Sequence, residues 1–265
     1  MDAAPRGGGT GVRRERRRTV GWGPRKYIGA MFRALVTGVM ARTAAAVPAR
    51  CAVCGAWPAR PVCDVCVQRF AQPVPRCRRC ALPVAPGIET CGACLQAPPP
   101  IDACHVAVSY GFPWAGCITR FKFQGETGWA PWLALLLRST PWVEPALEAA
   151  DRVLPMPLSP QRLQERGYNQ AALLARHLAP DRFDDRLLLR IRHTPAQSGL
   201  DRAARLASVR GAFAVDPLRA AAVAGQRVVL IDDVMTSGAS LHAAAAALRQ
   251  AGAVHIVALA VARTD

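Results

Sequence analysis

The chain has 265 residues, of which 51% are apolar and 20% are charged, and its 34 Lys and Arg outnumber its 18 Asp and Glu. This length is enough for one or two domains with a substantial core, and the composition excludes general disorder and collagen-like repeats. The longest apolar runs, such as Trp129–Leu137, fall short of the roughly 20 residues that a membrane-spanning helix needs, so we expect no transmembrane segment.

The positive charge is concentrated at the start of the chain. Residues 1–50 hold eleven Lys or Arg against two acids, an excess of nine out of the total of sixteen. Only Lys26 and Lys122 are lysines, so an arginine-rich codon bias accounts for part of this basicity. The remaining excess permits contact with polyanions such as phosphate, DNA or an anionic lipid surface.

Residues 1–24 are expected to be a disordered basic tail, or untranslated sequence if translation starts at Met31 or Met40. The run Arg13–Arg18 is not followed by a continuous apolar core, so it is not a secretory signal. We therefore expect a cytoplasmic protein.

Residues 25–48 are predicted to form an amphipathic helix. Apolar residues recur there at helical spacing, namely Ile28, Met31, Phe32, Leu35, Val36, Val39 and Met40. Such a helix can lie on a membrane surface or dock on a partner. We favour the alternative, a helix that packs on the next module of the same chain.

Residues 49–100 are predicted to form a small zinc-binding module. They contain four C-x-x-C pairs, Cys51/Cys54, Cys63/Cys66, Cys77/Cys80 and Cys91/Cys94. Two such turns supply the four thiolates of a tetrahedral zinc site, so the four pairs can hold one or two ions. The intervening segments are rich in Pro and are expected to be short loops or hairpins.

Disulfides and a redox motif are the alternatives for these cysteines. Disulfides conflict with the missing secretion signal, and a redox C-x-x-C normally occurs once, beside a strand and helix. Structural zinc is therefore favoured. We interpret Cys104 and Cys117, which lie outside the pattern, as ordinary buried or partly buried thiols.

Residues 101–265 alternate between predicted strands and helices. The strands are Cys104–Tyr110, Arg152–Pro155, Leu187–Ile191, Arg227–Ile231 and Val254–Val261, and the helices are Trp114–Phe123, Trp129–Arg138, Pro160–Leu178 and Ala239–Ala251. This alternation predicts an α/β domain with a doubly wound parallel sheet, whose ligands bind at the carboxyl ends of the strands.

One segment carries the chemistry expected at that edge. Four branched apolar residues, 228–231, precede Asp232 and Asp233, and Thr236–Ser240 then open an Ala-rich helix. The amides at a helix N-terminus, together with hydroxyls and a Gly, can hold a phosphate. Two acids beside such a loop suit a ribose 5-phosphate, with the acids on the vicinal hydroxyls. An acid pair that only caps the helix would explain one Asp.

The segment VVLIDDVMTSGAS resembles the phosphoribosyl pyrophosphate (PRPP) motif of type I phosphoribosyltransferases. The cysteine pairs and four further segments narrow the resemblance to the ComF family. These segments are FKFQGE at 121–126, LPMPL followed by QERGYNQ at 164–170, LRIRHTPAQ at 189–197 and RGAF at 210–213. The chain departs from the family pattern at Ser208, where an Asn is expected, and in its long N-terminal extension.

The resemblance implies a zinc-ribbon-like module before a type I phosphoribosyltransferase domain that binds PRPP with Mg²⁺. Asp232 and Asp233 would hold the ribose as positive charge develops on it. The remaining ligand-binding residues would be Val234, Met235, Thr236, Ser237, Gly238, Ala239 and Ser240 on the 5-phosphate, with Lys122 and Arg166 as phosphate contacts. Gln197 and Arg205 would belong to a loop over the site.

The resemblance also implies a role in competence, with single-stranded DNA and a helicase-like protein as partners. Two functions remain open. The first is a PRPP-dependent transferase with an unidentified acceptor. The second is a DNA-binding or partner-binding module whose PRPP site is regulatory or vestigial.

Overall fold

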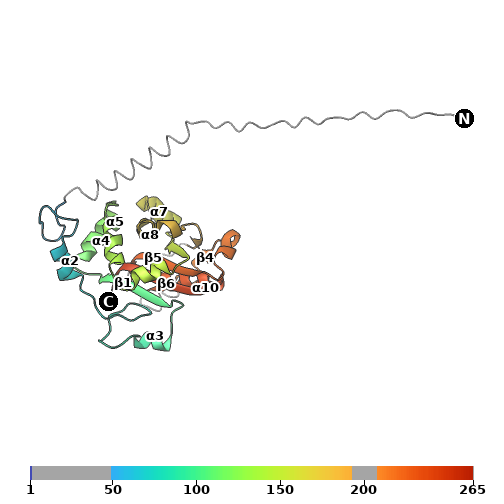
Figure 1. Cartoon of the computed structure of the whole chain (residues 1–265), viewed down its shortest axis with the longest axis horizontal. Coiled ribbons are helices and arrows are strands. Elements are labelled where there is room, and N and C mark those ends of the chain that lie inside the picture. The colour runs from blue at the N-terminus through green and yellow to red at the C-terminus, as the bar shows by residue number, and fades with distance from the viewer. Residues whose placement is uncertain (2–48, 193–207, 265) are drawn as a thin grey trace. The chain divides into compact units, whose positions relative to one another are not determined.

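The computed structural model of the chain describes Met1, 49–192 and 208–264. Ala49–Asp265 forms one compact unit, distinct from Met1–Pro48 (Figure 1). The predicted basic tail at 1–24, the predicted helix at 25–48, and Gln197 and Arg205 lie outside the described residues.

Four parallel strands form the central sheet of this unit, in the order β1-β6-β5-β2. They are β1 (Ala103–Ser109), β2 (Arg152–Pro155), β5 (Arg227–Met235) and β6 (His255–Arg263). Together with the helices between the strands, this confirms the predicted doubly wound α/β fold.

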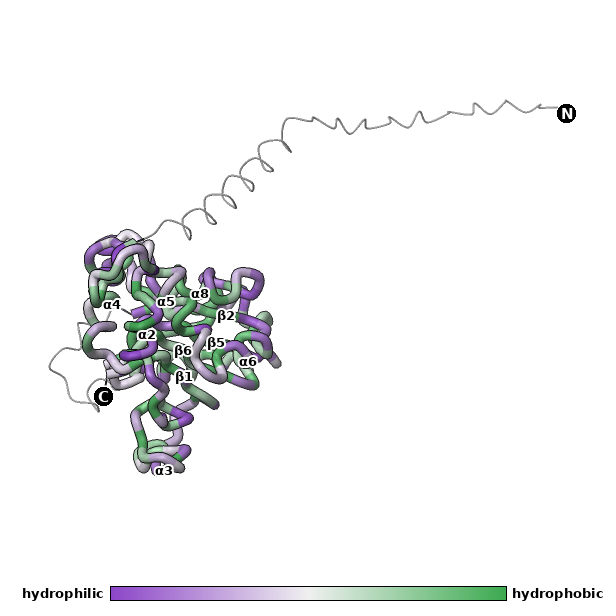
Figure 2. The backbone as a smooth tube through the Cα atoms, turned by 60° about the vertical axis from the view of Figure 1, so that its left-hand side comes forward, coloured by the Kyte–Doolittle hydropathy of each residue, from purple (hydrophilic) through white to green (hydrophobic). Residues whose placement is uncertain are grey.

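Both faces of the sheet are covered, because alternate residues of β5 enter two separate cores. Val229 and Ile231 pack in one core, whereas Val228 and Leu230 pack in the other. Successive strand residues point to opposite faces, so a run of four branched apolar residues belongs in a strand buried on both sides. The hydropathy colouring shows these strands as hydrophobic segments in the interior of the unit (Figure 2).

The first face of the sheet, on the side of Val229, is covered by helices. Its core contains residues of α4 (Trp114–Phe123), α5 (Trp129–Arg138), α6 (Val143–Glu148) and α8 (Gln170–Leu178). The second face, on the side of Val228, is covered by α10 (Ala239–Gln250) and by the short strands β3 (Leu188–Arg190) and β4 (Phe213–Val215). Two short 3-10 turns, Pro180–Arg182 and Pro217–Ala222, complete the unit.

The long helix predicted at Pro160–Leu178 is wrong, because the segment forms two helices. The first, α7 (Pro160–Arg166), ends at Gly167, whose φ of 78° lies in the left-handed region that favours glycine. The second, α8, begins after Asn169, whose side chain accepts a hydrogen bond from the amide of Ala172. The break turns the chain so that Asn169 and Arg166 reach the same cleft.

The strand predicted at Leu187–Ile191 exists but does not join the parallel sheet. It is β3 (Leu188–Arg190), which pairs antiparallel with β4 (Phe213–Val215) in a separate two-stranded sheet. Three residues are too few to distinguish the two arrangements by periodicity.

Each half of the cysteine-rich segment contains a short helix, and the first of them extends beyond Cys66 into a segment that was expected to be a loop or hairpin. They are α2 (Asp64–Phe70) and α3 (Gly92–Gln96), and each begins directly after the first cysteine of a C-x-x-C pair. Within the described residues, no helix has the length and apolar character needed to cross a membrane.

Candidate functional site

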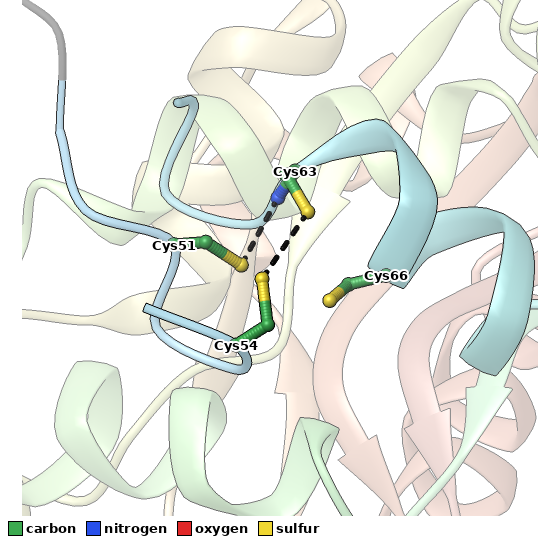
Figure 3. Close-up of side chains that lie close together, drawn as sticks. All are labelled: Cys51, Cys54, Cys63 and Cys66. Carbon is green, nitrogen blue, oxygen red and sulfur yellow. Dashed lines mark hydrogen bonds between the residues drawn. The ribbon is translucent and has the colours of Figure 1, made fainter. Parts of the chain in front are cut away.

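The eight cysteines of the C-x-x-C pairs gather into two tetrads. The first consists of Cys51, Cys54, Cys63 and Cys66, and the second of Cys77, Cys80, Cys91 and Cys94. In each tetrad the sulfur atoms lie within 4.8 Å of one another, and Figure 3 shows the four side chains of the first tetrad converging. All eight are free thiols. Each tetrad therefore has the ligand set of a tetrahedral metal site.

Backbone amides favour the thiolate form of one cysteine in each tetrad. The amide of Cys63 donates to Cys51 Sγ, and the amide of Cys91 donates to Cys77 Sγ, both at 3.3 Å. Burial opposes ionisation, but the amides outweigh it and lower the pKa of Cys51 to about 6 and that of Cys77 to about 7. Burial and the neighbouring sulfurs raise the pKa of Cys66 to about 12. A divalent cation at the centre is the partner that this crowding of thiols fits.

The two tetrads pack on opposite faces of the sheet. Cys51 and Cys66 belong to the core on the first face, where Trp114 Nε1 donates to the carbonyl of Phe70 at 2.8 Å. Cys77, Cys80 and Cys94 belong to the core on the second face. Figure 1 shows the corresponding helices, α2 and α3, at separate places around the sheet.

A cleft of about 340 Å³ opens at the carboxyl end of β5. Of the residues predicted to bind the ligand, seven line it: Lys122, Arg166, Asp232, Asp233, Val234, Thr236 and Ser240. Ligands of open parallel sheets bind at this edge. The cleft is therefore the candidate binding site.

Asp232 and Asp233 are held differently although they are adjacent. Asp233 Oδ1 accepts hydrogen bonds from Lys122 Nζ at 3.0 Å and from the amide of Val234 at 2.8 Å. Asp232 Oδ1 accepts from the amide of Asp233 at 2.9 Å, and its charge acts on Arg190 of β3. Consecutive strand residues point to opposite faces, so the two carboxylates line opposite walls of the cleft.

The environment of Asp232 favours its neutral form. Burial and the charge of Asp233 raise the pKa of Asp232 to about 7, against the opposing effect of Lys122. Near neutral pH this carboxyl is therefore poised between its two protonation states.

Four cations line the cleft, two of which the sequence analysis missed. Besides Lys122 and Arg166 they are Arg162 and Arg190. Arg162 lies one turn before Arg166 on α7, and this spacing places both side chains on one helix face. The same spacing is visible in the sequence and could have indicated Arg162. Arg190 lies in the segment LRIRHTPAQ at 189–197, which contributes to the resemblance but was not interpreted as a ligand contact. Burial lowers the pKa of Arg166 and of Arg190, and four cations against two acids suit a polyanionic ligand.

The loop Met235–Ser240 is built around Gly238. Gly238 precedes α10 with a φ of 78°, and Ala239 donates its amide to Ser237 Oγ at 3.4 Å. A Cβ on Gly238 would lie 2.4 Å from Met235 Cε and 3.0 Å from His242 Nε2. Glycine is thus required by the backbone conformation and by packing inside the loop, a reason that differs from the expected close approach of a phosphate.

The loop residues divide into lining and supporting ones. Thr236 and Ser240 line the cleft, whereas the side chains of Met235 and Ala239 are buried in the core. The first amides of a helix have no acceptor within it, and together with the helix dipole they favour an anion.

Two buried polar atoms in the cleft have no hydrogen-bond partner among the described residues. They are Asp233 Oδ2 and Gln170 Nε2, on side chains that are almost fully buried. Such atoms are costly unless a ligand, ion or water satisfies them. The carboxylates, the unpaired atoms and the cations fit a phosphorylated sugar and a hard cation such as Mg²⁺.

A larger cleft of about 980 Å³ lies at the amino ends of the strands, where Ala103, Arg227 and His255 contribute to its lining. Its lining is mainly apolar, and it holds neither the acid pair nor the Thr236–Ser240 loop. Size alone does not identify the site, because the charged groups converge in the smaller cleft.

Comparison with known proteins supports the reading of this cleft. Residues 169–265 match the family model described as "Phosphoribosyl transferase domain". The DNA utilization protein YhgH of Salmonella typhimurium is 31% identical over 214 residues, which is 77% of this chain and 90% of that protein. Competence protein F of Haemophilus influenzae is 31% identical over 72% of this chain and 85% of its own length. Competence protein ComFC of Bacillus subtilis is 38% identical over 38% of this chain and 39% of its own length.

Proposed function

This chain belongs to the ComF family of phosphoribosyltransferase-like proteins, and we propose that it binds PRPP with Mg²⁺ and transfers the phosphoribosyl group to a nucleophilic acceptor. The observation that carries this proposal is the convergence of an acid pair, a phosphate-type loop and four cations in one cleft at the carboxyl end of β5.

Each wall of the cleft has a part in the proposed binding. Thr236–Ser240, at the N-terminus of α10, holds the 5-phosphate. Asp232 and Asp233 hold the ribose hydroxyls, and Arg162, Arg166 and Arg190 hold the pyrophosphate. Lys122 Nζ forms an ion pair with Asp233 Oδ1 at 3.0 Å, so the predicted phosphate contact of Lys122 requires that pair to open.

The proposed reaction is a displacement at the anomeric carbon of the ribose. The bond from that carbon to the pyrophosphate oxygen breaks, and the leaving pyrophosphate takes the electron pair. The acceptor forms the new bond to the carbon and releases its proton to water. Bound Mg²⁺ would neutralise charge on the leaving group, while the arginines stabilise it electrostatically.

Release of pyrophosphate tests the transferase proposal. Purified protein with PRPP, Mg²⁺ and a panel of nucleobases and amines should release pyrophosphate only when Mg²⁺ and a suitable acceptor are both present. Tight PRPP binding in calorimetry, with no release for any acceptor, would favour a binding protein over an enzyme.

A second candidate function is a DNA-handling module whose PRPP site is regulatory or vestigial. Two observations favour it. The Lys122 ammonium already donates a hydrogen bond to the Asp233 carboxylate, and relatives are named DNA utilization protein and competence protein. The net charge of +16 suits single-stranded DNA, whose binding should weaken steeply as salt rises. A helicase-like competence protein would be a partner of this module.

We further propose that each cysteine tetrad holds one structural Zn²⁺. Four thiols per site with no His, Asp or Glu leave no open position for a catalytic water. The metal would therefore stabilise the fold and take no part in the displacement.

A further inference from the structure

A buried arginine joins the second cysteine tetrad to the phosphate-binding loop. Arg263, at the end of β6, is 3% exposed. Its Nε donates to the carbonyl of Cys80 at 2.8 Å, and its Nη1 donates to the carbonyl of Met235 at 3.3 Å and to that of Thr236. One guanidinium therefore bonds both to a metal-ligand residue and to the first two residues of the loop.

The peptide geometry makes these carbonyls important for phosphate binding. In a trans peptide the carbonyl and the next amide point in opposite directions. The carbonyl of Thr236 points at Arg263, so the amide of Ser237, in the same peptide unit, points away from Arg263. The carbonyl of Met235 and the amide of Thr236 are related in the same way. The guanidinium thus sets the direction of the Ser237 amide, and it shares the carbonyl of Met235 with the amide of Thr264, which donates to it at 3.0 Å.

A second contact runs parallel to the first. Cys104 of β1 donates its thiol to Met235 Sδ at 3.5 Å and its amide to the carbonyl of Arg78 at 2.8 Å. Arg78 lies between the ligands Cys77 and Cys80. The knuckle is therefore tied to Met235 through β1 as well as through β6.

The first tetrad lacks such a connection. Its neighbourhood is held to α4 by the hydrogen bond from Trp114 to the carbonyl of Phe70. Among the described residues, no hydrogen bond links the first tetrad to residues 235–241. The two metal sites thus differ in their relation to the cleft although their ligand spacing is the same.

We infer that Arg263 is a positioning residue through which metal in the second tetrad, and not in the first, sets the geometry of the phosphate-binding loop. A metal ion fixes the turn that carries the Cys80 carbonyl. Without the metal this turn relaxes, and a buried donor then loses an acceptor, which is costly. Movement of the guanidinium to recover it releases the carbonyl of Thr236, whereas the carbonyl of Met235 also accepts a hydrogen bond from the amide of Thr264 at 3.0 Å.

Two matched variants separate the tetrads. Cys94→Ser and Cys66→Ser each remove one buried ligand, the last of its tetrad, from a short helix that follows another ligand. Both leave three thiols and should each lower the zinc content by about one ion. Only Cys94→Ser should loosen the loop.

Hydrogen exchange in the absence of ligand is the primary measurement. In the zinc-loaded full chain, exchange of peptides covering 235–241, relative to α5, should rise about tenfold in Cys94→Ser and less than about twofold in Cys66→Ser. An equal rise in both variants, no rise in either, or a rise in Cys94→Ser shared by α5 would overturn the inference.

Arg263→Lys isolates the positioning role. Lysine keeps the charge but cannot donate to Cys80 and to the loop in the same fork geometry. Zinc content should stay at the parent level while the loop exchanges faster, and adding Cys94→Ser to this variant should raise exchange little further. If the loop of Arg263→Lys is as protected as the parent's, Arg263 does not position it.

Binding of ribose 5-phosphate supplies a second measurement, which rests on the proposed function. Its affinity should fall about tenfold in Cys94→Ser and in Arg263→Lys, and stay within about twofold in Cys66→Ser. If the parent itself does not bind ribose 5-phosphate or PRPP, the proposed function fails, while the exchange measurement still decides the coupling.

Discussion

Lys122 Nζ lies 3.0 Å from Asp233 Oδ1, although 111 positions separate the two residues in the chain. Lys122 comes from α4 on the first face of the sheet, and Asp233 from the carboxyl end of β5. Their side chains are 25% and 6% exposed. The pair places a cation on one acid of the cleft and leaves the other acid, Asp232, without a comparable partner among the described residues.

We predict that Asp233→Asn destabilises the fold, because it leaves the Lys122 ammonium without its counter-ion. Loss of one partner from a partly buried pair should cost about 1–3 kcal/mol of unfolding free energy. Lys122→Met in the same chain should recover most of that loss. Urea unfolding of the two single variants and the double variant measures this, and additive effects would show that the pair is not coupled.

Asp232→Asn should stabilise the fold above neutral pH. The folded chain holds the pKa of Asp232 at about 7, above its unfolded value of 3.8. The stability that this group contributes is therefore fully present below about pH 4 and is lost as pH rises through about 7. The variant should exceed the parent in unfolding free energy at pH 8, and the difference should shrink toward pH 4. A matched control is Asp185→Asn, at a residue that pairs with Arg176 outside the cleft.

Asp232→Asn should also weaken the binding of PRPP in the presence of Mg²⁺. Removal of a charged hydrogen-bond partner should lower PRPP affinity by about 1.5–3 kcal/mol, and the affinity of the parent should rise as Asp232 ionises through pH 7. Calorimetric titration at pH 6 and pH 8 measures both effects. Unchanged PRPP affinity in Asp232→Asn would remove this carboxylate from the proposed ribose site.

Gly238→Ala should disrupt the loop by more than the strain of an alanine at a positive φ alone. The new Cβ would meet Met235 Cε at 2.4 Å, which adds about 1–3 kcal/mol to the cost of a left-handed alanine. Gly125→Ala is the matched control, because Gly125 has a φ of 72° and nothing within 4 Å of an added Cβ. Ribose 5-phosphate affinity should fall at least about tenfold in Gly238→Ala and stay unchanged in Gly125→Ala. Equal losses in both variants would point to the backbone conformation alone.

Arg190→Met should show whether Arg190 contacts the pyrophosphate or the 5-phosphate of PRPP. If Arg190 contacts the pyrophosphate, PRPP affinity should drop about tenfold or more, whereas ribose 5-phosphate, which lacks that group, should bind as before. Arg176→Met, outside the cleft, is the control. Equal losses for both ligands would place Arg190 at the 5-phosphate or in the fold instead.

Metal analysis should find about two Zn²⁺ per chain and no disulfide among the eight cysteines of the tetrads. Chelation should loosen both faces of the sheet, because Cys51 and Cys66 are buried in one core and Cys77, Cys80 and Cys94 in the other. An exchange experiment in which the central strands keep their protection after complete metal removal would contradict it.

The sequence by itself determined several features whose signal is local. Apolar periodicity located Trp114–Phe123 and Trp129–Arg138, and the run before Asp232 marked a strand buried on both faces. The C-x-x-C spacing identified the cysteines that gather into tetrads, because a knuckle is a turn of four residues. The order of motifs predicted the family, which the relatives confirm.

Only the tertiary structure decided which distant residues meet. The pairing of the cysteines into two tetrads, their positions on opposite faces, and the convergence of Arg162 and Arg190 on one cleft depend on strand order and crossovers. Arg190 is one of two arginines in the segment 189–197 and Arg263 lies outside every motif, so neither could be assigned a contact from the sequence. Their partners lie on other strands, and contacts of that kind are set when the sheet assembles, since local spacing carries no information about which faces will pack together.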